Sequence, residues 1–380
     1  MTDATTVWDN PADIIRKTRP QNPVMAFAPS VLAETARRFL DGFPGLVTYA
    51  VKSNPDEEVI RTLLKAGVTG FDVASPFEID LIGRMAPLAA RHYHNPVRSR
   101  REIEHAVAAG ITSWSVDSQS ELDKLFELVP PEGCEISPRF TLPVTGAIYD
   151  FGSKFGATVE CAAEYLHQVQ ARGYIPSLTF HPGTQCTDPA AWETYIRTAY
   201  DICDAAGVTA RRLNVGGGFP SHRVHGIAPD LEAIFGLIDR VTTETFGTRR
   251  PELVCEPGRG LCADAFSLIT CVKAVRDGGH VFLNDGVYGG LTELPMVGNL
   301  ERLEVLTPEG LPRDGAEQGR AVFGPTCDSV DRLPGELTLP ANIEEGDYVI
   351  FHGAGAYSVV TNTRFNGFGE MERATVNALE

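Results

Sequence analysis

The chain has 380 residues, of which 43% are hydrophobic and 22% charged, and its formal net charge is −17. This length exceeds what one hydrophobic core usually supports, so it predicts two domains. The composition is that of a globular protein, and the acidic balance argues against a general nucleic-acid-binding or membrane-binding surface.

The first residues, MTDATTVWDNPADIIRK, are acidic and lack an apolar segment, which argues against a signal peptide. No run of about 18 apolar residues occurs, so the sequence predicts no membrane span. The eight cysteines are scattered without a CxxC pair or a Cys/His metal-binding spacing. We therefore expect a cytoplasmic protein with reduced thiols, no disulfide framework and no bound metal.

A short apolar strand at 24–27 and a helix over 30–39 open the predicted fold. From there, strand-like and helical patterns alternate at the spacing of βαβ units, and several helical stretches close with Ala-Gly, a common helix stop. The predicted strands are 46–51, 70–73, 91–94, 113–116, 135–140, 177–181, 212–215 and 252–256. Their number predicts a (β/α)8 (TIM) barrel over residues 28–264. A doubly wound open sheet is the alternative, because periodicity does not show whether a sheet closes.

The pattern changes after this region. Short strands separated by Gly- and Pro-rich turns are predicted at 281–283, 320–323, 347–351 and 358–361, with little helix between them. We expect residues 265–380 to form an all-β domain, and we expect residues 1–27 to join it through the strand at 24–27.

Polar residues and glycines collect where the barrel strands end, which is the face on which such barrels build active sites. In chain order they are Lys52, Asp72, Ser75, His94, Asn95, His181, Gly216–Gly218, Glu256 and Arg259. Lys52 ends a buried apolar strand, where its amine could be desolvated and its pKa lowered, as Schiff-base formation requires. A solvated lysine at a strand end is the alternative interpretation.

The glycine run Gly216–Gly218 and the end of the last predicted barrel strand, 252–256, suggest binding sites for a phosphate and for an aromatic ring. Gly216–Gly218 let backbone N–H groups approach an anion, and Arg259 supplies a second anion contact, although turns also use glycine for backbone freedom. Glu256 either pairs with Arg259 or faces a protonated ring nitrogen. His181 is either a core residue or a plate over that ring. A reactive lysine, a phosphate cradle and a carboxylate for a pyridinium together indicate pyridoxal phosphate.

Eight ordered motifs make a resemblance specific. They are YAVKSNP, FDVASPFE, HPGTQC, NVGGGFP, CEPGRG, NDGVYGG, GPTCDSVDRL and GAYSVVTNTRFNGF. Over about residues 24–368 the chain resembles the fold-type III pyridoxal-phosphate decarboxylases, which act on ornithine, lysine, diaminopimelate or, in some members, arginine. The resemblance implies a (β/α)8 barrel, a β domain built from both chain ends, and a head-to-tail homodimer with two shared active sites.

The resemblance also implies residue roles. Lys52 would form the Schiff base, Glu256 would hold the pyridine nitrogen, and His181 would stack on the ring. Asp72 and Glu78 would belong to the network around the ring and the lysine. The expected phosphate contacts are Thr184, Gly216, Gly217, Gly218, Arg259 and Tyr357.

Substrate contacts are expected from the C-terminal domain. The resemblance implies that Cys327 and Asp328 reach into the site from the neighbouring subunit. Cys327 would return a proton to the carbanion left by CO2 loss, and Asp328 would contact the distal amine of the substrate. Tyr288 is counted among the substrate contacts. The Cys-Asp-Ser triplet favours the ornithine-type branch over diaminopimelate decarboxylases, which carry glutamate after the cysteine. Ornithine decarboxylases place a second acidic residue nine positions after the tyrosine of DGVYG, and here that position is Val297.

Glu293 or Glu301 would have to replace that missing carboxylate. A second departure is Asp150, where the family tends to have a basic residue. We therefore expect a decarboxylase of a basic L-amino acid in polyamine biosynthesis, with ornithine or lysine as the default and a longer or modified substrate as a variant. The alternatives are a diaminopimelate decarboxylase, an alanine-racemase-like enzyme, or a non-catalytic regulatory homologue, for which the retained site residues would be unnecessary.

Overall fold

The structure is a computed structural model that describes residues 6–143, 148, 154–276 and 278–380. It divides into two compact units. The barrel unit comprises Ala36–Pro220 and Asp230–Gly260, and the sheet unit comprises the described residues up to Thr35, with Ser221–Pro229 and Leu261–Glu380. The sequence did not anticipate that a loop between two barrel elements, Ser221–Pro229, groups with the sheet unit. Among the described residues, no helix combines the length and the apolar character needed to cross a bilayer.

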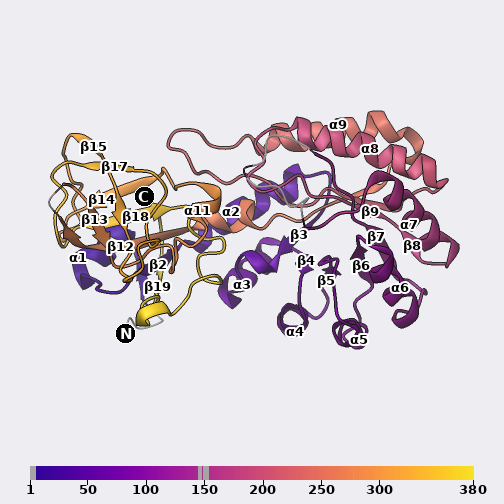
Figure 1. Cartoon of the computed structure of the whole chain (residues 1–380), viewed down its shortest axis with the longest axis horizontal. Coiled ribbons are helices and arrows are strands. Elements are labelled where there is room, and N and C mark those ends of the chain that lie inside the picture. The colour runs from indigo at the N-terminus through magenta and orange to yellow at the C-terminus, as the bar shows by residue number, and fades with distance from the viewer. Residues whose placement is uncertain (1–5, 144–147, 149–153, 277) are drawn as a thin grey trace. The chain divides into compact units, whose positions relative to one another are not determined.

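Parallel strands form the centre of the barrel unit (Figure 1). In sheet order the described strands are β8 (Ile175–Pro176), β7 (Glu135–Pro138), β6 (Ser113–Val116), β5 (Ala90–Tyr93), β4 (Gly70–Val73), β3 (Gly45–Ala50), β11 (Glu252–Cys255), β10 (Arg212–Asn214) and β9 (Leu178–Thr179). Only Ser177 separates β8 from β9, and β8 pairs with β7 while β9 pairs with β10. The two segments are therefore halves of one strand that closes the sheet, which confirms the predicted barrel.

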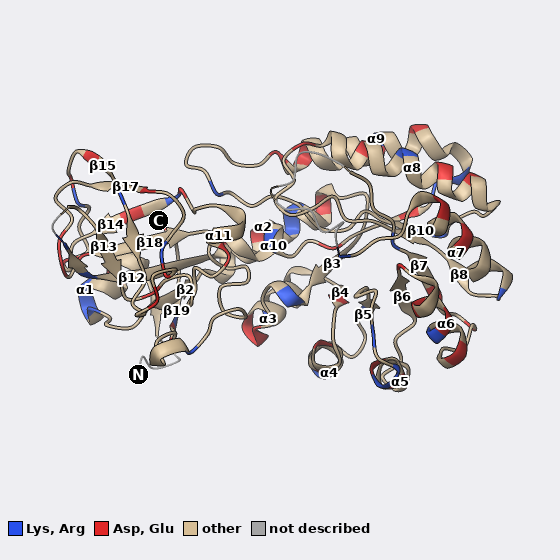
Figure 2. Cartoon of the chain, in the orientation of Figure 1, with Lys and Arg blue, Asp and Glu red and all other residues tan. Residues whose placement is uncertain are grey.

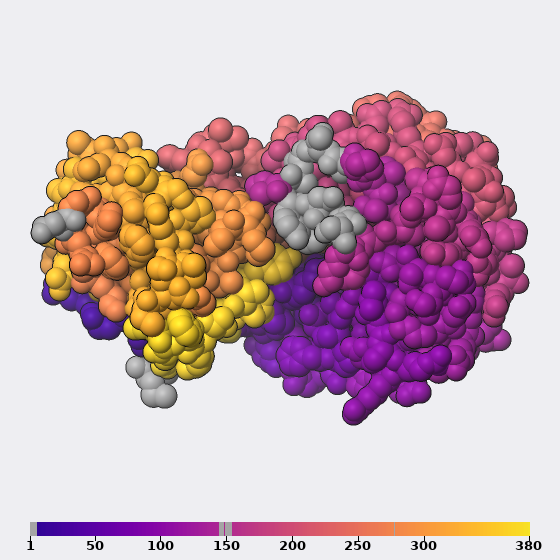
Figure 3. Space-filling model, in the orientation of Figure 1, coloured from indigo at the N-terminus to yellow at the C-terminus, as the bar shows by residue number. Residues whose placement is uncertain are grey.

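Helices follow the strands and cover the outside of the barrel (Figure 1). They are α2 (Pro29–Gly42), α3 (Glu57–Ala66), α4 (Pro76–Met85), α5 (Arg100–Ala108), α6 (Gln119–Leu128), α7 (Val159–Ala171), α8 (Ala190–Ala206) and α9 (Leu231–Phe246). Ser99 and Glu102 form a capping box at the start of α5, and α3 and α8 end at Gly67 and Gly207, as the Ala-Gly stops predict. Figure 2 shows acidic and basic residues along these helices, and Figure 3 shows the segments of the barrel unit, coloured from violet to pink, side by side on the face toward the viewer.

The inner face of the barrel is polar. Strand β6 reads Ser-Trp-Ser-Val, and all four residues are buried. Arg212 on β10 forms a 2.9 Å ion pair with Glu135 on β7, and His94 after β5 lies 2.9 Å from Asn214 on β10. Because these pairs join strands that are not neighbours, the polar side chains point into the barrel and the apolar ones face the helices. Bulky branched residues more commonly fill a barrel interior.

The sheet unit contains both chain ends in one sheet. Its described strands are β1 (Val7–Trp8), β2 (Val24–Phe27), β12 (Phe266–Val275), β13 (Val281–Leu283), β14 (Leu303–Leu306), β16 (Val322–Phe323), β18 (Tyr348–His352) and β19 (Glu372–Val376), with β15 (Glu317–Arg320) and β17 (Leu337–Pro340) forming a separate pair. Strand β2 pairs with β12 and with β19, which confirms that the early strand joins the C-terminal sheet. Short helices are α1 (Pro11–Thr18), α10 (Arg259–Cys262, across the unit boundary) and α11 (Leu294–Val297).

One predicted strand of this unit is wrong. Residues 358–361 form a turn instead. Tyr357 has a left-handed φ of 67°, and its carbonyl accepts hydrogen bonds from the N–H groups of Val360 (3.1 Å) and Thr361 (3.0 Å). The backbone therefore folds back on itself and cannot pair in a sheet, although Ser-Val-Val-Thr has β-type residues. All eight cysteines have free thiols, and Cys327 is exposed.

Candidate active site

Lys52 lies at the carboxyl end of β3, in a single turn of 3-10 helix (η1, Val51–Ser53). Its Nζ lies 3.8 Å from Oδ2 of Asp72, which belongs to the neighbouring strand β4. The Asp72 side chain is 4% exposed and the Lys52 side chain 49% exposed. The two strand ends thus place a lysine that solutes can reach above a buried carboxyl group, on the face where the sequence predicts the chemistry.

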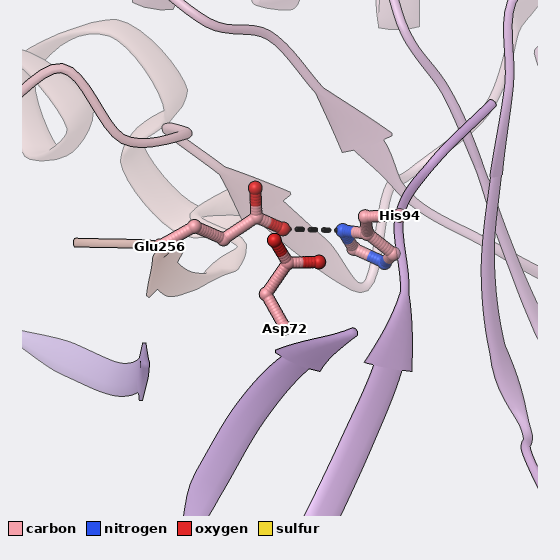
Figure 4. A group of neighbouring side chains, drawn as sticks. All are labelled: Asp72, His94 and Glu256. Carbon is pink, nitrogen blue, oxygen red and sulfur yellow. Dashed lines mark hydrogen bonds and ion pairs between the residues drawn. The ribbon is translucent and has the colours of Figure 1, made fainter. Parts of the chain in front are cut away.

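Two side chains from other strands bind Glu256, the residue that follows β11. Its Oε1 lies 2.5 Å from Nδ1 of His94 (Figure 4). The same oxygen accepts a hydrogen bond of 2.5 Å from Nδ2 of Asn214. The Asn214 Oδ1 accepts a hydrogen bond of 2.9 Å from the backbone N–H of Gly216, which orients the amide. On the other side of the imidazole, Nε2 lies 3.2 Å from Oγ of Ser113. Glu256 is therefore fixed by residues that reach it across the barrel.

The charges of Glu256 and His94 stabilise each other against burial. Burial alone would raise the pKa of Glu256, but the charge and hydrogen bond of His94, followed by the charge of Lys52 and the hydrogen bond of Asn214, lower that pKa to about 2. Burial would lower the pKa of His94, but the charge and hydrogen bond of Glu256 raise it. Both shifts favour a carboxylate paired with an imidazolium whose Nδ1–H donates to Oε1.

Asp72 is the acid that holds its proton most readily in this cluster. Burial and then the negative charge of Glu256 raise the pKa of Asp72 to about 7, although Lys52 and His94 act in the opposite direction. Its Oδ1 is buried and, among the described residues, has no hydrogen-bond partner. One proton in the cluster therefore resides on Asp72 at or below neutral pH.

The cluster formed by Asp72, His94 and Glu256 could also be considered as a metal centre. Each residue offers one ligand atom, and these atoms lie within 4.8 Å of one another. A metal-bound imidazole must be neutral and must present a free nitrogen lone pair. Because Nδ1 of His94 is engaged with Glu256 and the interaction favours the protonated ring, the geometry favours a hydrogen-bonded cluster.

His181 follows β9 and is held as a neutral ring. The backbone N–H of Gly183 donates a hydrogen bond of 3.0 Å to Nδ1, which places the proton of the neutral imidazole on Nε2. Burial, followed by the nearby charges of Arg139 and Lys52, lowers the pKa of His181 to about 3. A neutral aromatic ring can stack on a cofactor ring without adding charge.

Glycine is required by the backbone at two positions of the loop after β10. Gly216 and Gly218 have φ angles of 70° and 83°. A Cβ at Gly216 would lie 2.2 Å from the carbonyl oxygen of Phe180, and one at Gly218 would lie 2.3 Å from that of Gly183. The loop therefore admits no side chain at these two positions. Because the Gly216 N–H already donates to Asn214, the N–H groups of Gly217 and Gly218 are the ones that could bind an anion.

The barrel residues fit pyridoxal phosphate. Arg259 is buried beside this region at the start of α10 and supplies a positive charge suited to a phosphate. Thr184 lies in the loop after His181, where its carbonyl accepts a hydrogen bond of 3.0 Å from Ile148. The glycine loop and Arg259 could bind a phosphate, Glu256 could accept a hydrogen bond from a protonated ring nitrogen, and the amine of Lys52 could react with an aldehyde.

Glu78 closes the loop that follows Asp72. Its Oε2 accepts a hydrogen bond of 2.7 Å from the backbone N–H of Ala74, and Oγ of Ser75 accepts one of 3.3 Å from the Glu78 N–H at the start of α4. Burial raises the pKa of Glu78, while the Ala74 hydrogen bond and the charge of Lys52 oppose this shift. Glu78 thus stabilises the loop and lies near enough to Lys52 to feel its charge.

Three residues of this region received no role from the sequence. His94 was noted at a strand end, whereas Asn214 and Arg139 were not singled out. Asn214 is an inward polar residue at the end of β10 (Arg-Leu-Asn), and Arg139 directly follows β7 (Glu-Ile-Ser-Pro). The alternation of polar and apolar residues within these strands is the signal that could have identified them.

The remaining predicted residues lie in the sheet unit. The hydroxyl of Tyr288 donates a hydrogen bond of 2.7 Å to Oδ2 of Asp328, and the Tyr288 ring packs on Phe365 at 4.9 Å between centroids. Cys327 is exposed, and its backbone N–H donates a hydrogen bond of 3.0 Å to Oδ1 of Asn366. The sheet unit therefore brings Tyr288, Cys327 and Asp328 together.

The position of the missing carboxylate is apolar. Val297 is buried at the end of α11. Glu293, one candidate replacement, forms a 3.5 Å ion pair with the buried Arg223 inside the sheet unit, and Glu301, the other, is exposed. Asp150 lies outside the described residues.

Comparisons with known proteins agree with this arrangement. Residues 30–263 match the family described as "Pyridoxal-dependent decarboxylase, pyridoxal binding domain". The chain is 31% identical to the lysine/ornithine decarboxylase of Selenomonas ruminantium over 85% of this chain and 81% of that protein. It is 32% identical to the ornithine decarboxylase of Panagrellus redivivus over 84% of this chain and 77% of that protein. The crystal structure of the Paramecium bursaria Chlorella virus arginine decarboxylase superposes with a TM-score of 0.85 at 25% identity, covering 95% of this chain and 98% of that one.

Proposed function

Because the chain belongs to the pyridoxal-dependent decarboxylase family, we propose that it removes the α-carboxyl group of a basic L-amino acid and releases CO2 and the corresponding amine. Ornithine and lysine are the default substrates, by analogy with the relatives from Selenomonas ruminantium and Panagrellus redivivus. The observation that carries the proposal is the barrel mouth in which Lys52 lies 3.8 Å from Asp72 while His94 and Asn214 hold Glu256.

Bound pyridoxal phosphate supplies an aldehyde that links to amines and an electron-accepting ring that stabilises the negative charge left at Cα when CO2 departs. Lys52 holds the aldehyde end through Nζ. Gly216–Gly218 and Arg259, with Thr184 and Tyr357, bind the phosphate. His181 covers a face of the ring as a neutral imidazole.

The protein contributes two proton positions. Glu256 accepts the hydrogen bond of a protonated ring nitrogen, and it can do so because its carboxylate stays ionised. The partner subunit's Cys327 donates its Sγ proton to the substrate Cα after the carboxylate has left as CO2, and solvent restores that proton. Each turnover thus converts one carboxylate and one proton into CO2 and a C–H bond.

Only one carboxylate is expected to contact the distal end of the substrate, whereas a distal ammonium group would favour two. Asp328 is the expected carboxylate, its Oδ2 already accepts a hydrogen bond from Tyr288, and Glu293 is engaged with Arg223. A charge-assisted hydrogen bond contributes roughly 1.5–3 kcal/mol, enough to change substrate preference. We therefore include longer basic amino acids and those with a substituted distal nitrogen among the proposed substrates.

A homodimer with shared active sites is part of the proposal. Cys327 is exposed, and Val330, three residues later in the sequence, is 63% exposed. Phe365, which packs on the Tyr288 ring, is 41% exposed. Exposed apolar groups beside functional polar ones are typical of an interaction surface.

The test is CO2 release by the cofactor-loaded protein. The panel contains ornithine, lysine, arginine, their derivatives acylated or alkylated at the distal nitrogen, the stereoisomers of diaminopimelate and, to detect racemisation, L-alanine. Release of CO2 from one or more basic L-amino acids supports the proposal. Release from diaminopimelate alone, racemisation of alanine without CO2, or no turnover of any panel member would reject it.

A further inference from the structure

His94 contacts the residue that the proposed function assigns to the ring nitrogen, although the motifs gave it no role. Its imidazole is buried, with 5% of the side chain exposed, and both of its nitrogens face polar groups, Glu256 on one side and Ser113 on the other. Building on the proposed function, we propose that His94 is a positioning residue that holds Glu256 as an anion and presents one carboxylate oxygen to the ring nitrogen of pyridoxal phosphate.

The hydrogen bonds of Glu256 explain the orientation. His94 and Asn214 both contact Oε1, at 2.5 Å each, whereas Oε2 accepts no hydrogen bond from a described residue. Asn214 cannot rotate its amide without losing the hydrogen bond from Gly216. Oε2 is therefore the oxygen left to accept a hydrogen bond from a ring N–H.

The contacts among Glu256, His94 and Asn214 give the direction of the hydrogen bonds to the Glu256 carboxylate. The amide Nδ2 of Asn214 lies 2.9 Å from Nδ1 of His94. The 2.5 Å approach of Nδ1 to a carboxylate oxygen requires a hydrogen between them, so Nδ1 donates to Glu256. Nδ1 then cannot accept from Asn214, whose amide hydrogen also goes to Glu256. The carboxylate oxygen thus collects both donors, as an anion does and a protonated carboxyl oxygen does less well.

The charges around His94 support a cation at this position. The acidic groups that act on it are Glu256, Asp72 on β4 and Glu135 on β7, and together they raise its pKa against burial. His92, two residues earlier on the same chain segment, has its pKa lowered to about 4, first by burial and then by the charge of His94. The surroundings therefore favour the charged form of His94 and the neutral form of His92.

A different explanation is that His94 merely fills a polar barrel interior. In that case replacing His94 would disturb the barrel and weaken the binding of every ligand at the carboxyl ends of the barrel strands to the same extent. If His94 acts through Glu256, its replacement weakens only ligands that contain the ring nitrogen. The two explanations are separated by comparing pyridoxal phosphate with the analogue that carries carbon in place of the ring nitrogen.

The experiment measures equilibrium dissociation constants of both compounds with cofactor-free full-length chain, for the wild type, His94→Gln and the control His92→Gln. We expect His94→Gln to weaken pyridoxal phosphate by about 10-fold or more, as for a lost charge-assisted interaction, and the analogue by less than about 2-fold. His92→Gln, buried on the same strand segment without a hydrogen bond to Glu256, should leave both constants within about 2-fold.

Equal weakening of both compounds by His94→Gln, or no weakening of either, would overturn the inference. Wild-type protein that binds neither compound would instead reject the proposed function. If His94→Gln does not fold, His94→Asn takes its place, and wild-type protein with 15N-labelled histidine supplies an independent measurement. An imidazole that keeps both nitrogens protonated to a higher pH than an ordinary histidine supports the inference, and one that loses its proton like an ordinary histidine contradicts it.

Discussion

Lys52 and Asp72 face each other across neighbouring strands, with Nζ 3.8 Å from Oδ2. The carboxyl group is buried and the amine is half exposed, so Asp72 can orient the amine from below while a cofactor reaches it from above. This relationship places the proposed covalent attachment on one atom, Nζ of Lys52, and makes it directly testable.

Lys52→Ala should lose the attachment. Borohydride reduction of the wild type with pyridoxal phosphate should label the peptide that contains residue 52, as read by mass spectrometry. In Lys52→Ala this label should vanish, and kcat should fall by roughly 10²-fold or more, because the amine that links to the aldehyde is lost. Lys65→Ala, which changes an exposed lysine on α3, is the control and should keep both label and activity. A label on another lysine of the wild type would contradict the assignment.

Asp72→Asn should stabilise the cofactor-free protein in a pH-dependent way. The folded pKa of Asp72 is raised to about 7 from 3.8, so the folded state keeps a proton that the unfolded chain has lost between these values. Stability from this group therefore falls as pH rises from about 4 to 7, by an amount on the order of a few kcal/mol. The melting temperature of Asp72→Asn should exceed that of the wild type increasingly up to pH 7 and level off above it. A difference independent of pH would show that Asp72 does not titrate in this range.

Gly218→Ala should destabilise the barrel unit and weaken cofactor binding. The φ of 83° strains any side chain, and the added Cβ would meet the carbonyl oxygen of Gly183 at 2.3 Å. Gly173→Ala is the matched control, because Gly173 has a φ of 82° with nothing within 4 Å of the added atom. We expect the midpoint of urea unfolding to report a loss about 1–3 kcal/mol larger for Gly218→Ala than for Gly173→Ala. Equal losses would mean that backbone strain alone, and not the close approach, requires glycine at position 218.

Asp328→Asn should act on substrate rather than on cofactor. Asp328 accepts the hydrogen bond of Tyr288, and it is the carboxylate proposed for the distal nitrogen. Replacing it should lower kcat/KM for substrates with a charged distal group by about 10–150-fold, which corresponds to roughly 1.5–3 kcal/mol, and should leave the dissociation constant of pyridoxal phosphate unchanged. Asp314→Asn, at an exposed position of the sheet unit, is the control. Unchanged kcat/KM in Asp328→Asn would remove Asp328 from the substrate contacts.

Mixing two inactive variants should restore activity if active sites are shared between subunits. Lys52→Ala removes a barrel residue and Cys327→Ala a sheet-unit residue. In a hybrid dimer one site would contain both changes and the other neither, so an equimolar, fully exchanged mixture should recover about 25% of wild-type activity. The variants mixed without subunit exchange serve as the control. No recovery after demonstrated exchange would place Lys52 and Cys327 of a working site in the same subunit.

Much of the fold could be predicted from local patterns, because each barrel strand is a short apolar or alternating run and each helix ends at a recognisable stop. Closure could not, since it depends on β8 and β9 pairing to opposite neighbours, which periodicity does not encode. The turn at 358–361 was mistaken for a strand because the left-handed backbone of Tyr357 overrides the β-type residues after it.

Site residues that lie within a sequence motif could be predicted. Site residues that contact Glu256 from a distant strand could not. Lys52 and Glu256 stand out because each ends a buried run. His94 and Asn214 meet Glu256 only across the barrel, so no spacing in the sequence joins them. The pairing of Glu293 with Arg223 likewise depends on a loop, Ser221–Pro229, that groups with the sheet unit.

The polar inner face of the barrel has a consequence for how the strands find their alignment. Shifting one strand by a single residue would turn Trp114 or Phe71 inward and would press Ser113 or Asp72 against the covering helices. Such a misaligned barrel would bury charges without partners on one side and crowd aromatic rings into its axis on the other. The side chains that hold the chemistry in place therefore also discriminate the native strand alignment from its nearest competitors during folding.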